Sequence, residues 1–298
     1  MDMKIGVVGL GIMGKPIAAN LIKADYAITV FNRTAVKAKA FVDEIGGVMA
    51  STPAEAAKAS DVVITMVADS PDVEEVILGP AGVAASEKKG LTVIDMSTIS
   101  PGVTKRISKR LQEAGMEMLD APVSGGEKGA VEGTMTIFVG GREQVFKRCL
   151  PVFEAIGKTI TYMGESGAGQ LTKLCNQIIC SHNLFSICEG LVFASKAGLD
   201  VQKLISALSG GSAQSWMLST QAPKILDRDF RPGFFVKHEQ KDLRLVLEAA
   251  REIGVSLPGT SLIHQLYNSL ETEEGGATRA HISLVRAVEK LAGHEVGK

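Results

Sequence analysis

Short apolar runs alternate with amphipathic stretches through the first half of the chain. Residues 4–8 (KIGVV), 27–31 (AITVF) and 61–66 (DVVITM) have the length and branched apolar composition of buried strands. Further strands are expected at 92–96, 116–121, 134–140 and 158–163. Helical periodicity follows several of these runs, for example at 35–45 and at 101–114, where Ser100 and Pro101 suit a helix start. This alternation predicts an α/β fold with a doubly wound, mostly parallel sheet.

The pattern changes near residue 164, after which it is helical almost throughout. Helices are expected near 168–197, 201–208, 215–226, 237–253, 257–273 and 277–292. We therefore predict two domains, an α/β domain over residues 1–163 and an all-helical domain over residues 164–298. The long helix that begins after the glycine-rich turn at Gly164–Gly169 would join them.

Composition and charge narrow the function classes. Hydrophobic residues make up 45% and charged residues 22% of the 298 residues, and the net charge is −1. Such a balance predicts a globular protein and favours neither a nucleic-acid partner nor a membrane surface. No run approaches 18 uninterrupted apolar residues, the N-terminal apolar run is too short for a signal peptide, and the four cysteines form no CxxC. A cytoplasmic location is the resulting expectation.

The first candidate site is the turn that follows the first predicted strand. Here Gly9-Leu10-Gly11-Ile12-Met13-Gly14 leads into a helical segment. In a GxGxxG turn the first glycine allows the tight turn, the second lets the backbone approach a pyrophosphate, and the third allows close helix–strand packing. Strand, turn and helix in this order predict a Rossmann-type dinucleotide site, with the helix N-terminus facing the phosphates.

The residues after the second strand bear on cofactor choice. Enzymes that use NAD usually carry Asp or Glu there for the ribose hydroxyls, whereas this chain has Asn32-Arg33-Thr34. Arg33 can pair with a 2′-phosphate, and Asn32 and Thr34 can donate hydrogen bonds to it. We therefore expect NADP rather than NAD, although the same three residues would also suit the cap of the helix at 35–45.

Other strand ends add candidate residues, because ligands lie at the carboxyl ends of strands in open α/β sheets. Met66 and Val67 end one strand. Ser124-Gly125-Gly126 follows another and offers a hydroxyl group and several backbone N–H groups, which are the groups that bind a carboxylate. A plain flexible turn is an equal reading of these three residues from composition alone.

The helix after Gly164 carries an unusual lysine. Lys173 lies early on an otherwise apolar helix, with Asn176 and Gln177 at i+3 and i+4 on the same side. The positive end of the helix dipole and burial would both lower the pKa of Lys173. A lysine of that kind can exchange a proton with a substrate oxygen, whereas the ordinary alternative is a snorkelling lysine at a helix edge.

Four ordered motifs give the chain a resemblance to a known family. They are GLGIMG at the start, DAPVSGG at 120–126, GAGQLTK at 167–173 and PGFFVKHEQKDL at 232–243. Together they closely resemble the β-hydroxyacid dehydrogenase family, which includes 3-hydroxyisobutyrate dehydrogenases, 2-hydroxy-3-oxopropionate reductases and glyoxylate or succinic semialdehyde reductases. The resemblance covers essentially the whole chain.

The resemblance implies roles for individual residues. GLGIMG would hold the cofactor pyrophosphate, and Ser124 and Gly125 would bind the substrate carboxylate, with Gly126 completing that motif. Lys173 matches the catalytic lysine, Thr98 a cofactor contact, and Lys241 a lysine near the nicotinamide. Phe234 and Asp242 fall in the same site-lining segment. The family often has Asn four residues after the lysine. This chain has Gln177 there and Asn176 just before it, so both stay candidates.

The resulting expectation is an NADP-dependent oxidoreductase that interconverts a small semialdehyde, or a glyoxylate-like oxo acid, and its hydroxy acid. Lys173 would be the general acid or base. No metal is expected, because no histidine has a second ligand at metal spacing. A homo-oligomer, dimer or tetramer, is expected. The rivals are an imine reductase and a catalytically inactive cofactor-binding scaffold, both of which Lys173 disfavours, and 6-phosphogluconate dehydrogenase, whose helical domain is far longer.

Overall fold

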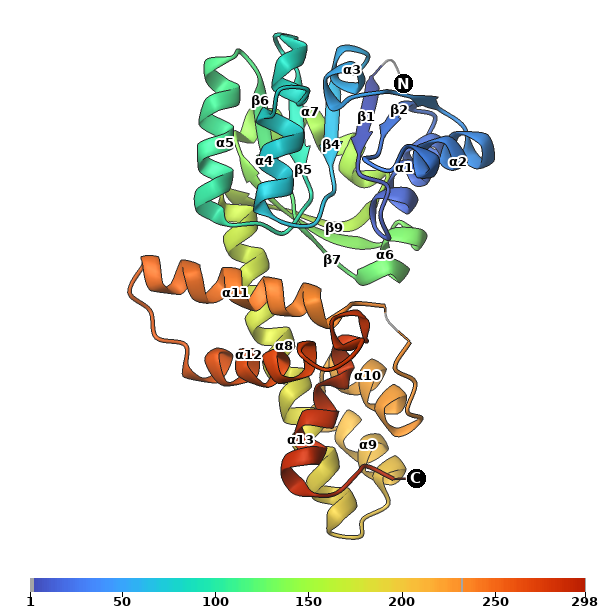
Figure 1. Ribbon diagram of the computed structural model, residues 1–298, viewed down its shortest axis with the longest axis vertical. Coiled ribbons are helices and arrows are strands. Elements are labelled where there is room, and N and C mark those ends of the chain that lie inside the picture. Colours follow the sequence, from blue (N-terminus) through green and yellow to red (C-terminus); the bar gives the residue numbers. More distant parts are fainter. Residues whose placement is uncertain (1–2, 232, 298) are drawn as a thin grey trace. The chain divides into compact units, whose positions relative to one another are not determined.

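The computed structural model describes residues 3–231 and 233–297, and Figure 1 shows its helices and strands. The chain forms two compact units, one that ends at Lys173 and one that begins at Leu174. Helix α8 (Ala168–Lys196) starts in the first unit and continues into the second. Each unit is described by itself.

The first unit is built on one sheet. Its strands are β1 (Lys4–Val8), β2 (Ala27–Phe31), β3 (Val48–Met49), β4 (Val62–Thr65), β5 (Thr92–Asp95), β6 (Glu117–Asp120), β7 (Val123–Ser124), β8 (Met135–Gly141) and β9 (Gly157–Gly164). They lie in the order β3-β2-β1-β4-β5-β6-β8-β7, and β9 also pairs with β8. All pairs are parallel except β6 with β8 and β7 with β8. The predicted doubly wound, mostly parallel sheet is therefore confirmed.

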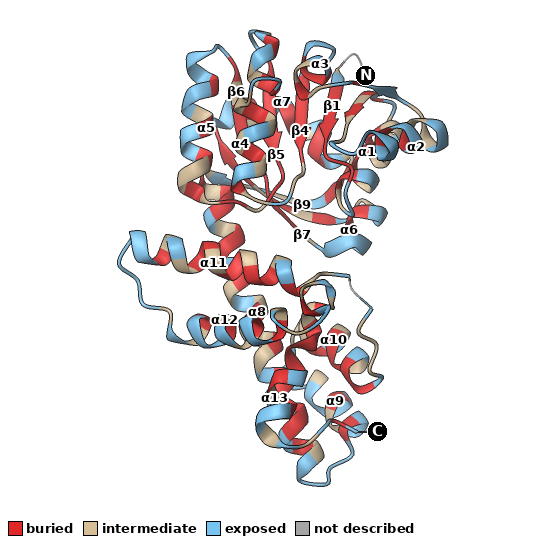
Figure 2. Cartoon of the chain, in the orientation of Figure 1, coloured by how far each residue is buried: buried red, intermediate tan, exposed pale blue. Residues whose placement is uncertain are grey.

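Helices cover both faces of this sheet (Figure 1). They are α1 (Gly14–Lys23), α2 (Ala35–Ile45), α3 (Pro53–Lys58), α4 (Ser70–Leu78), α5 (Pro101–Glu113), α6 (Gly126–Glu132) and α7 (Glu143–Glu154), with a 3₁₀ turn at Val83–Ser86. Successive side chains on a strand point to opposite faces. Accordingly Val62 and Ile64 of β4 pack with α1, α2 and α7, whereas Val63 packs with α3, α4 and α5. Figure 2 shows the central strands as the most buried part of this unit.

The second unit is helical, as predicted. It contains most of α8, then α9 (Val201–Ser209), α10 (Trp216–Leu226), α11 (Val236–Glu252), α12 (Pro258–Glu271) and α13 (Leu284–Ala292), with 3₁₀ turns at Gly276–Thr278 and His281–Ser283. Its core gathers apolar side chains from all of these helices.

One predicted helix starts later than expected. The helix predicted at 277–292 begins only at Leu284. The preceding segment pairs with the chain before α11: Val236 N donates to Arg279 O at 2.9 Å, and His281 N donates to Phe234 O at 2.8 Å. Arg279 and Ala280 are therefore extended and cannot join the helix.

Helix α8 is long and apolar enough to cross a bilayer by length and composition, and it is the one described helix of which this is true. Core helices of globular proteins satisfy the same criterion. Leu184, Cys188 and Leu191 of α8 lie in the core of the second unit.

Candidate functional site

The glycine turn between β1 and α1 lies at the point where the sheet order reverses, because β1 pairs with both β2 and β4. Gly9 has φ +101°, and a Cβ there would lie 2.3 Å from Met66 O. A Cβ on Gly14 would lie 1.9 Å from Gly9 O, whereas one on Gly11 would meet nothing within 4 Å. Gly9 and Gly14 are thus required by the fold, and Gly11 leaves the turn open to a ligand. This is the cradle that a dinucleotide pyrophosphate needs.

The three residues after β2 have different surroundings. Asn32 Oδ1 accepts a hydrogen bond from Leu10 N at 2.9 Å, and its Nδ2 donates to Thr34 O at 3.0 Å, so this side chain braces the glycine turn. Thr34 precedes α2 without a side-chain cap bond. The Arg33 side chain is 91% exposed and lies 3.4 Å from Asp72 Oδ1 of α4. Arg33 is accordingly the member of the three best placed to reach a phosphate in solvent.

The loop after β5 is tied to its neighbours by buried hydrogen bonds. Asp95 ends β5, and its Oδ1 accepts from Thr65 Oγ1 at 2.8 Å and from Ser97 N at 3.2 Å. Val67 N donates to Ser97 Oγ at 3.0 Å. Burial, only partly offset by these bonds, raises the pKa of Asp95 to about 6. Met66, Val67 and Thr98 therefore lie on a rigid part of the carboxyl edge of the sheet.

The Ser124-Gly125-Gly126 segment differs from the simple turn expected. Ser124 belongs to a short strand, β7, that pairs with β8, and the seven-residue helix α6 begins at Gly126. Gly125 and Gly126 have φ +131° and +61°, which disfavour other residues, and both are exposed. The segment keeps a half-buried hydroxyl group beside two accessible glycine backbones, which is compatible with carboxylate binding.

The first turn of α8 is held by a carboxylate from β6. Asp120 Oδ1 accepts from Gly167 N at 2.8 Å, and Asp120 Oδ2 accepts from Gln170 N at 2.9 Å. These bonds satisfy N–H groups that a helix start leaves unpaired. Burial raises the pKa of Asp120 even so. Lys173 follows in the next turn with 7% of its surface exposed. A nearly buried lysine is uncommon, and a simple snorkelling lysine would be more exposed.

The remaining predicted residues lie in the second unit, where α8 and α11 meet. Gln177 Nε2 donates to Asp242 Oδ2 at 2.7 Å, and Lys241 Nζ lies 2.7 Å from Asp242 Oδ1. Asn176 Nδ2 donates to Gln177 Oε1 at 2.9 Å. The structure therefore brings these four side chains into one network, with the carboxylate of Asp242 in its centre. Both the oxygen and the nitrogen of the Gln177 side-chain amide are therefore hydrogen-bonded.

Phe234 lies just before α11 and is in contact with two histidine rings. Its ring centroid is 5.6 Å from that of His238 and 5.7 Å from that of His281. Burial lowers the pKa of His238, and it lowers the pKa of His281 to about 4, so both rings are neutral near pH 7. Pro232, the first residue of the motif that contains Phe234, lies outside the described residues.

Sequence reasoning assigned no role to three polar residues of the first unit, although two of them lie in the quoted motifs DAPVSGG and GAGQLTK. They are Asp95, Asp120 and Gln170, which are 0%, 1% and 0% exposed. A signal was present for two of them, since each of the neighbouring apolar strands 92–95 and 117–120 ends in Asp. Gln170 gave no comparable signal, because its side-chain partners are more than 70 residues away in the chain.

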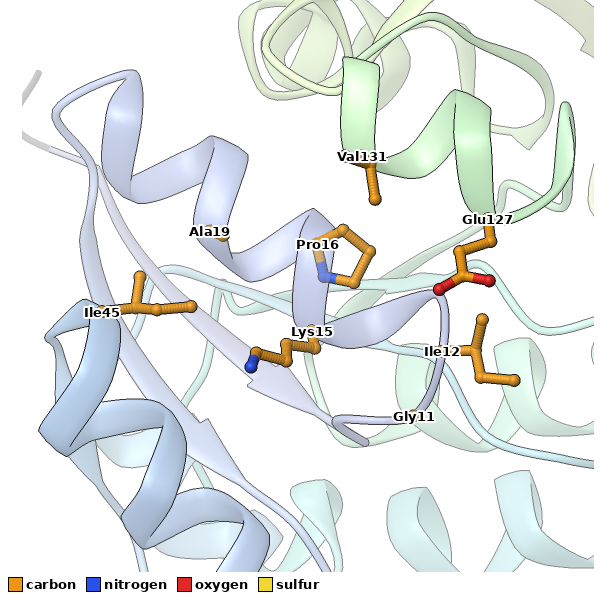
Figure 3. A pocket seen from close by; sticks show the side chains of 8 residues that line it. All are labelled: Gly11, Ile12, Lys15, Pro16, Ala19, Ile45, Glu127 and Val131. Carbon is orange, nitrogen blue, oxygen red and sulfur yellow. The ribbon is translucent and has the colours of Figure 1, made fainter. Parts of the chain in front are cut away.

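A small cavity lies beside the glycine turn, as Figure 3 shows. Its walls are Gly11, Ile12, Lys15, Pro16, Ala19, Ile45, Glu127 and Val131. Its volume of about 250 Å³ is below the roughly 300–1,000 Å³ of typical ligand pockets. It contains none of the predicted residues at the ends of β2, β4 and β5, so it is not by itself the dinucleotide site. Among the described residues, no three His, Cys, Asp or Glu side chains gather in a way that could hold a metal ion.

Two family models match the chain in succession. The NAD-binding domain of 6-phosphogluconate dehydrogenase matches residues 4–164, and the NAD-binding domain of NADP-dependent 3-hydroxyisobutyrate dehydrogenase matches residues 167–288. The chain is also 43% identical to 2-hydroxy-3-oxopropionate reductase of Escherichia coli strain K12, over 99% of this chain and all of that protein.

Two solved structures show the same fold over nearly the whole chain. The 3-hydroxyisobutyrate dehydrogenase of Mycobacterium tuberculosis, solved with L-serine, superposes with a TM-score of 0.89 at 31% identity, covering 97% of this chain and 99% of that one. Psf3, solved with NADP⁺ and 2-OPP, has a TM-score of 0.86 at 25% identity, covering 95% and 99%.

Proposed function

The chain belongs to the β-hydroxyacid dehydrogenase family, and on that premise we propose that it is an NADP-dependent reductase of a small semialdehyde or glyoxylate-like oxo acid. Membership makes it an NAD(P)-dependent enzyme that interconverts small semialdehydes and hydroxy acids. The proposal adds the cofactor, the direction and the role of Lys173. The observation that carries it is a nearly buried lysine in the second turn of a helix whose start is fixed against the carboxyl edge of a dinucleotide-binding sheet.

The residues around the glycine turn fit a dinucleotide. Gly9 and Gly14 pack too closely for any side chain, and Gly11 is open, so backbone N–H groups at the start of α1 can meet the pyrophosphate. Arg33 and Thr34 would contact the adenosine 2′-phosphate, with Asn32 bracing the turn. The residues that follow β2 include no carboxylate that would repel this phosphate, and the carboxylate that faces Arg33 is that of Asp72 on α4. NADP⁺ in the similar Psf3 structure supports the same choice.

When bound, the nicotinamide supplies the hydride for the carbonyl carbon. Lys173 would donate a proton from its ammonium group to the carbonyl oxygen, which becomes the hydroxyl of the product, and would take the proton back in the oxidative direction. Ser124 and the Gly125 and Gly126 N–H groups would bind the substrate carboxylate. These assignments require no metal.

Asn176 is the better candidate for contact with the substrate oxygen. Gln177 is 5% exposed and its amide is engaged by Asp242 and Asn176. Asn176 is less buried, and we propose that it contacts the substrate while Gln177 orients it. Lys241 and Phe234 would border the nicotinamide and the substrate.

We also propose a cytoplasmic homo-oligomer. None of the four cysteines forms a disulfide bond, as expected in a reducing compartment. Several large apolar side chains of the second unit are well exposed, among them Phe193 at 75% and Leu291 at 78%, and we propose that these two take part in the interface between copies.

The direct test is NADPH oxidation measured with glyoxylate and with succinic, tartronate and methylmalonate semialdehydes, each compared with NADH. We expect turnover of at least one substrate, with NADPH preferred. Lys173→Ala should lower kcat by about 10²–10⁴-fold and leave NADPH affinity nearly unchanged. Near-normal turnover by that variant would contradict the assigned role. Reduction of a cyclic imine but of no aldehyde would instead favour an imine reductase.

A further inference from the structure

The side chain of Gln170 bridges two backbone groups on either side of Thr98. Gln170 Nε2 donates to Ser97 O at 2.7 Å, and Gln170 Oε1 accepts from Ile99 N at 3.1 Å. The two bonded residues flank Thr98 directly, so one amide group fixes the backbone before and after it. Gln170 is fully buried, and so is Ile99.

The backbone of Gln170 is fixed as firmly as its side chain. Its N–H group donates to Asp120 Oδ2 at 2.9 Å. The neighbouring Gly169 packs so closely that a Cβ there would lie 2.5 Å from Phe138 O and 2.6 Å from Asp120 O. The first turn of α8 therefore cannot slide along or rotate against the sheet without breaking buried contacts.

The loop that Gln170 holds is also fixed from its other side. Ser97 N donates to Asp95 Oδ1, and Ser97 Oγ accepts from Val67 N. Since Asp95 ends β5 and Val67 follows β4, the loop is bound to the sheet on one side and to α8 on the other. Gln170 supplies two side-chain bonds from α8 to this loop.

Gln170 and Lys173 are three residues apart on α8 and therefore lie on the same side of the helix, within the first unit. We propose that Gln170 is a positioning residue that holds the Thr98 loop in register with Lys173. This inference rests on the proposed function, in which Thr98 contacts the cofactor and Lys173 the substrate oxygen. One amide then sets the spacing between the cofactor contact and the proton donor.

Two substitutions test this role. Gln170→Met keeps the length of the side chain and removes both hydrogen bonds. Gln170→Glu restores both bonds only when its carboxyl group is protonated, because only the acid form can donate to Ser97 O while it accepts from Ile99 N. The full burial of this side chain favours the acid form. Ser60→Ala is the matched control, because it removes a buried hydrogen bond of 2.7 Å from Ser60 Oγ to Ala56 O in the same unit. Ser60 precedes β4 and therefore lies away from the carboxyl edge of the sheet.

The measurements are kcat and KM with the best aldehyde, NADPH affinity by fluorescence titration, and the thermal midpoint. For Gln170→Met we expect a loss of about 10²-fold in kcat, the usual effect of a misplacement of about 1 Å, and NADPH affinity about tenfold weaker. Ser60→Ala should lower the thermal midpoint but leave kcat and the NADPH affinity near their wild-type values. The activity of Gln170→Glu relative to wild type should rise as the pH falls from 8 to 5.5, whereas that of Gln170→Met should stay constant.

The inference is overturned if Gln170→Met loses stability but keeps kcat and NADPH affinity within twofold of Ser60→Ala, or if both Gln170 variants respond to pH alike. Failure of the proposed function looks different. The wild type would then bind NADPH and reduce none of the aldehydes, and NADPH affinity of the variants would still report on the Thr98 loop.

Discussion

Asp95 should make the first unit less stable as the pH rises. Its carboxyl group is fully buried at the end of β5, and one oxygen, Oδ2, has no hydrogen-bond partner within the described structure. Burial raises its pKa to about 6, against about 3.9 in an unfolded chain. The folded state therefore holds the proton more tightly than the unfolded state does, and folding is opposed wherever the group must ionise.

The size of the effect follows from that difference in pKa. Two pKa units at about 1.4 kcal/mol each give a penalty of about 3 kcal/mol, fully present above pH 6 and absent below about pH 4. About 2 kcal/mol of it develops between pH 4.5 and 7.5. Asp95→Asn stays neutral throughout and keeps an acceptor for Thr65 and Ser97. The variant should therefore gain about 2 kcal/mol relative to wild type between these two pH values.

Urea unfolding followed by circular dichroism at pH 4.5 and 7.5 measures this change in the free energy of unfolding. Asp61→Asn is the control, because the Lys4 backbone N–H group lowers the pKa of Asp61. Asp61 contributes its full stabilisation at every pH above the pKa of an aspartate in the unfolded chain. The decrease in the free energy of unfolding caused by Asp61→Asn should therefore be nearly equal at pH 4.5 and 7.5. If the free energies of unfolding of Asp95→Asn and wild type differ by the same amount at both pH values, the reasoning is refuted.

Three further predictions concern the cofactor, the helix start and the interface. Arg33→Ser should raise KM for NADPH about tenfold, because a charge-assisted bond to the 2′-phosphate is lost, and leave KM for NADH unchanged. Equal changes for both cofactors in steady-state kinetics would contradict the assignment. Gly169→Ala should destabilise the first unit by about 3 kcal/mol or more, since its Cβ would clash with Phe138 O. Gly190→Ala, where a Cβ meets nothing within 4 Å, should be neutral or stabilising in the same thermal melt. Phe193→Glu should reduce the molar mass of the particle in size-exclusion chromatography with light scattering. An unchanged mass would exclude this residue from the interface.

The parts of the fold that the sequence predicted depend on local patterns. The strand at 4–8, the glycine turn and the following helix were predicted because each depends on neighbouring residues. The helix predicted at 277–292 started seven residues too early, because residues 279–281 pair with residues 234–236, more than 40 positions away. No local periodicity reveals such a bridge.

The same limit applies to the site. Motifs predict Lys173 and the glycine turn as candidate site residues, whereas the contacts that hold them in place could not be predicted. Asp120 bonds to Gly167 and Gln170 across 47 and 50 positions, and Gln170 bonds to Ile99 and Ser97 across 71 and 73. These partners come together only once β5, β6 and α8 are in place.

The contacts of Asp120 also bear on where the chain could be divided. A fragment that ends at residue 163, where the composition changes, would lack Gly167, Gly169 and Gln170. The carboxylate of Asp120 would then be left in an apolar surrounding without the Gly167 and Gln170 N–H donors. Ser97 O would lose its donor, Gln170 Nε2, and Ile99 N would lose its acceptor, Gln170 Oε1. The nucleotide-binding half is therefore completed by residues that sequence composition assigns to the other half. A separately expressed half would need to extend through Lys173 to fold with its polar groups paired.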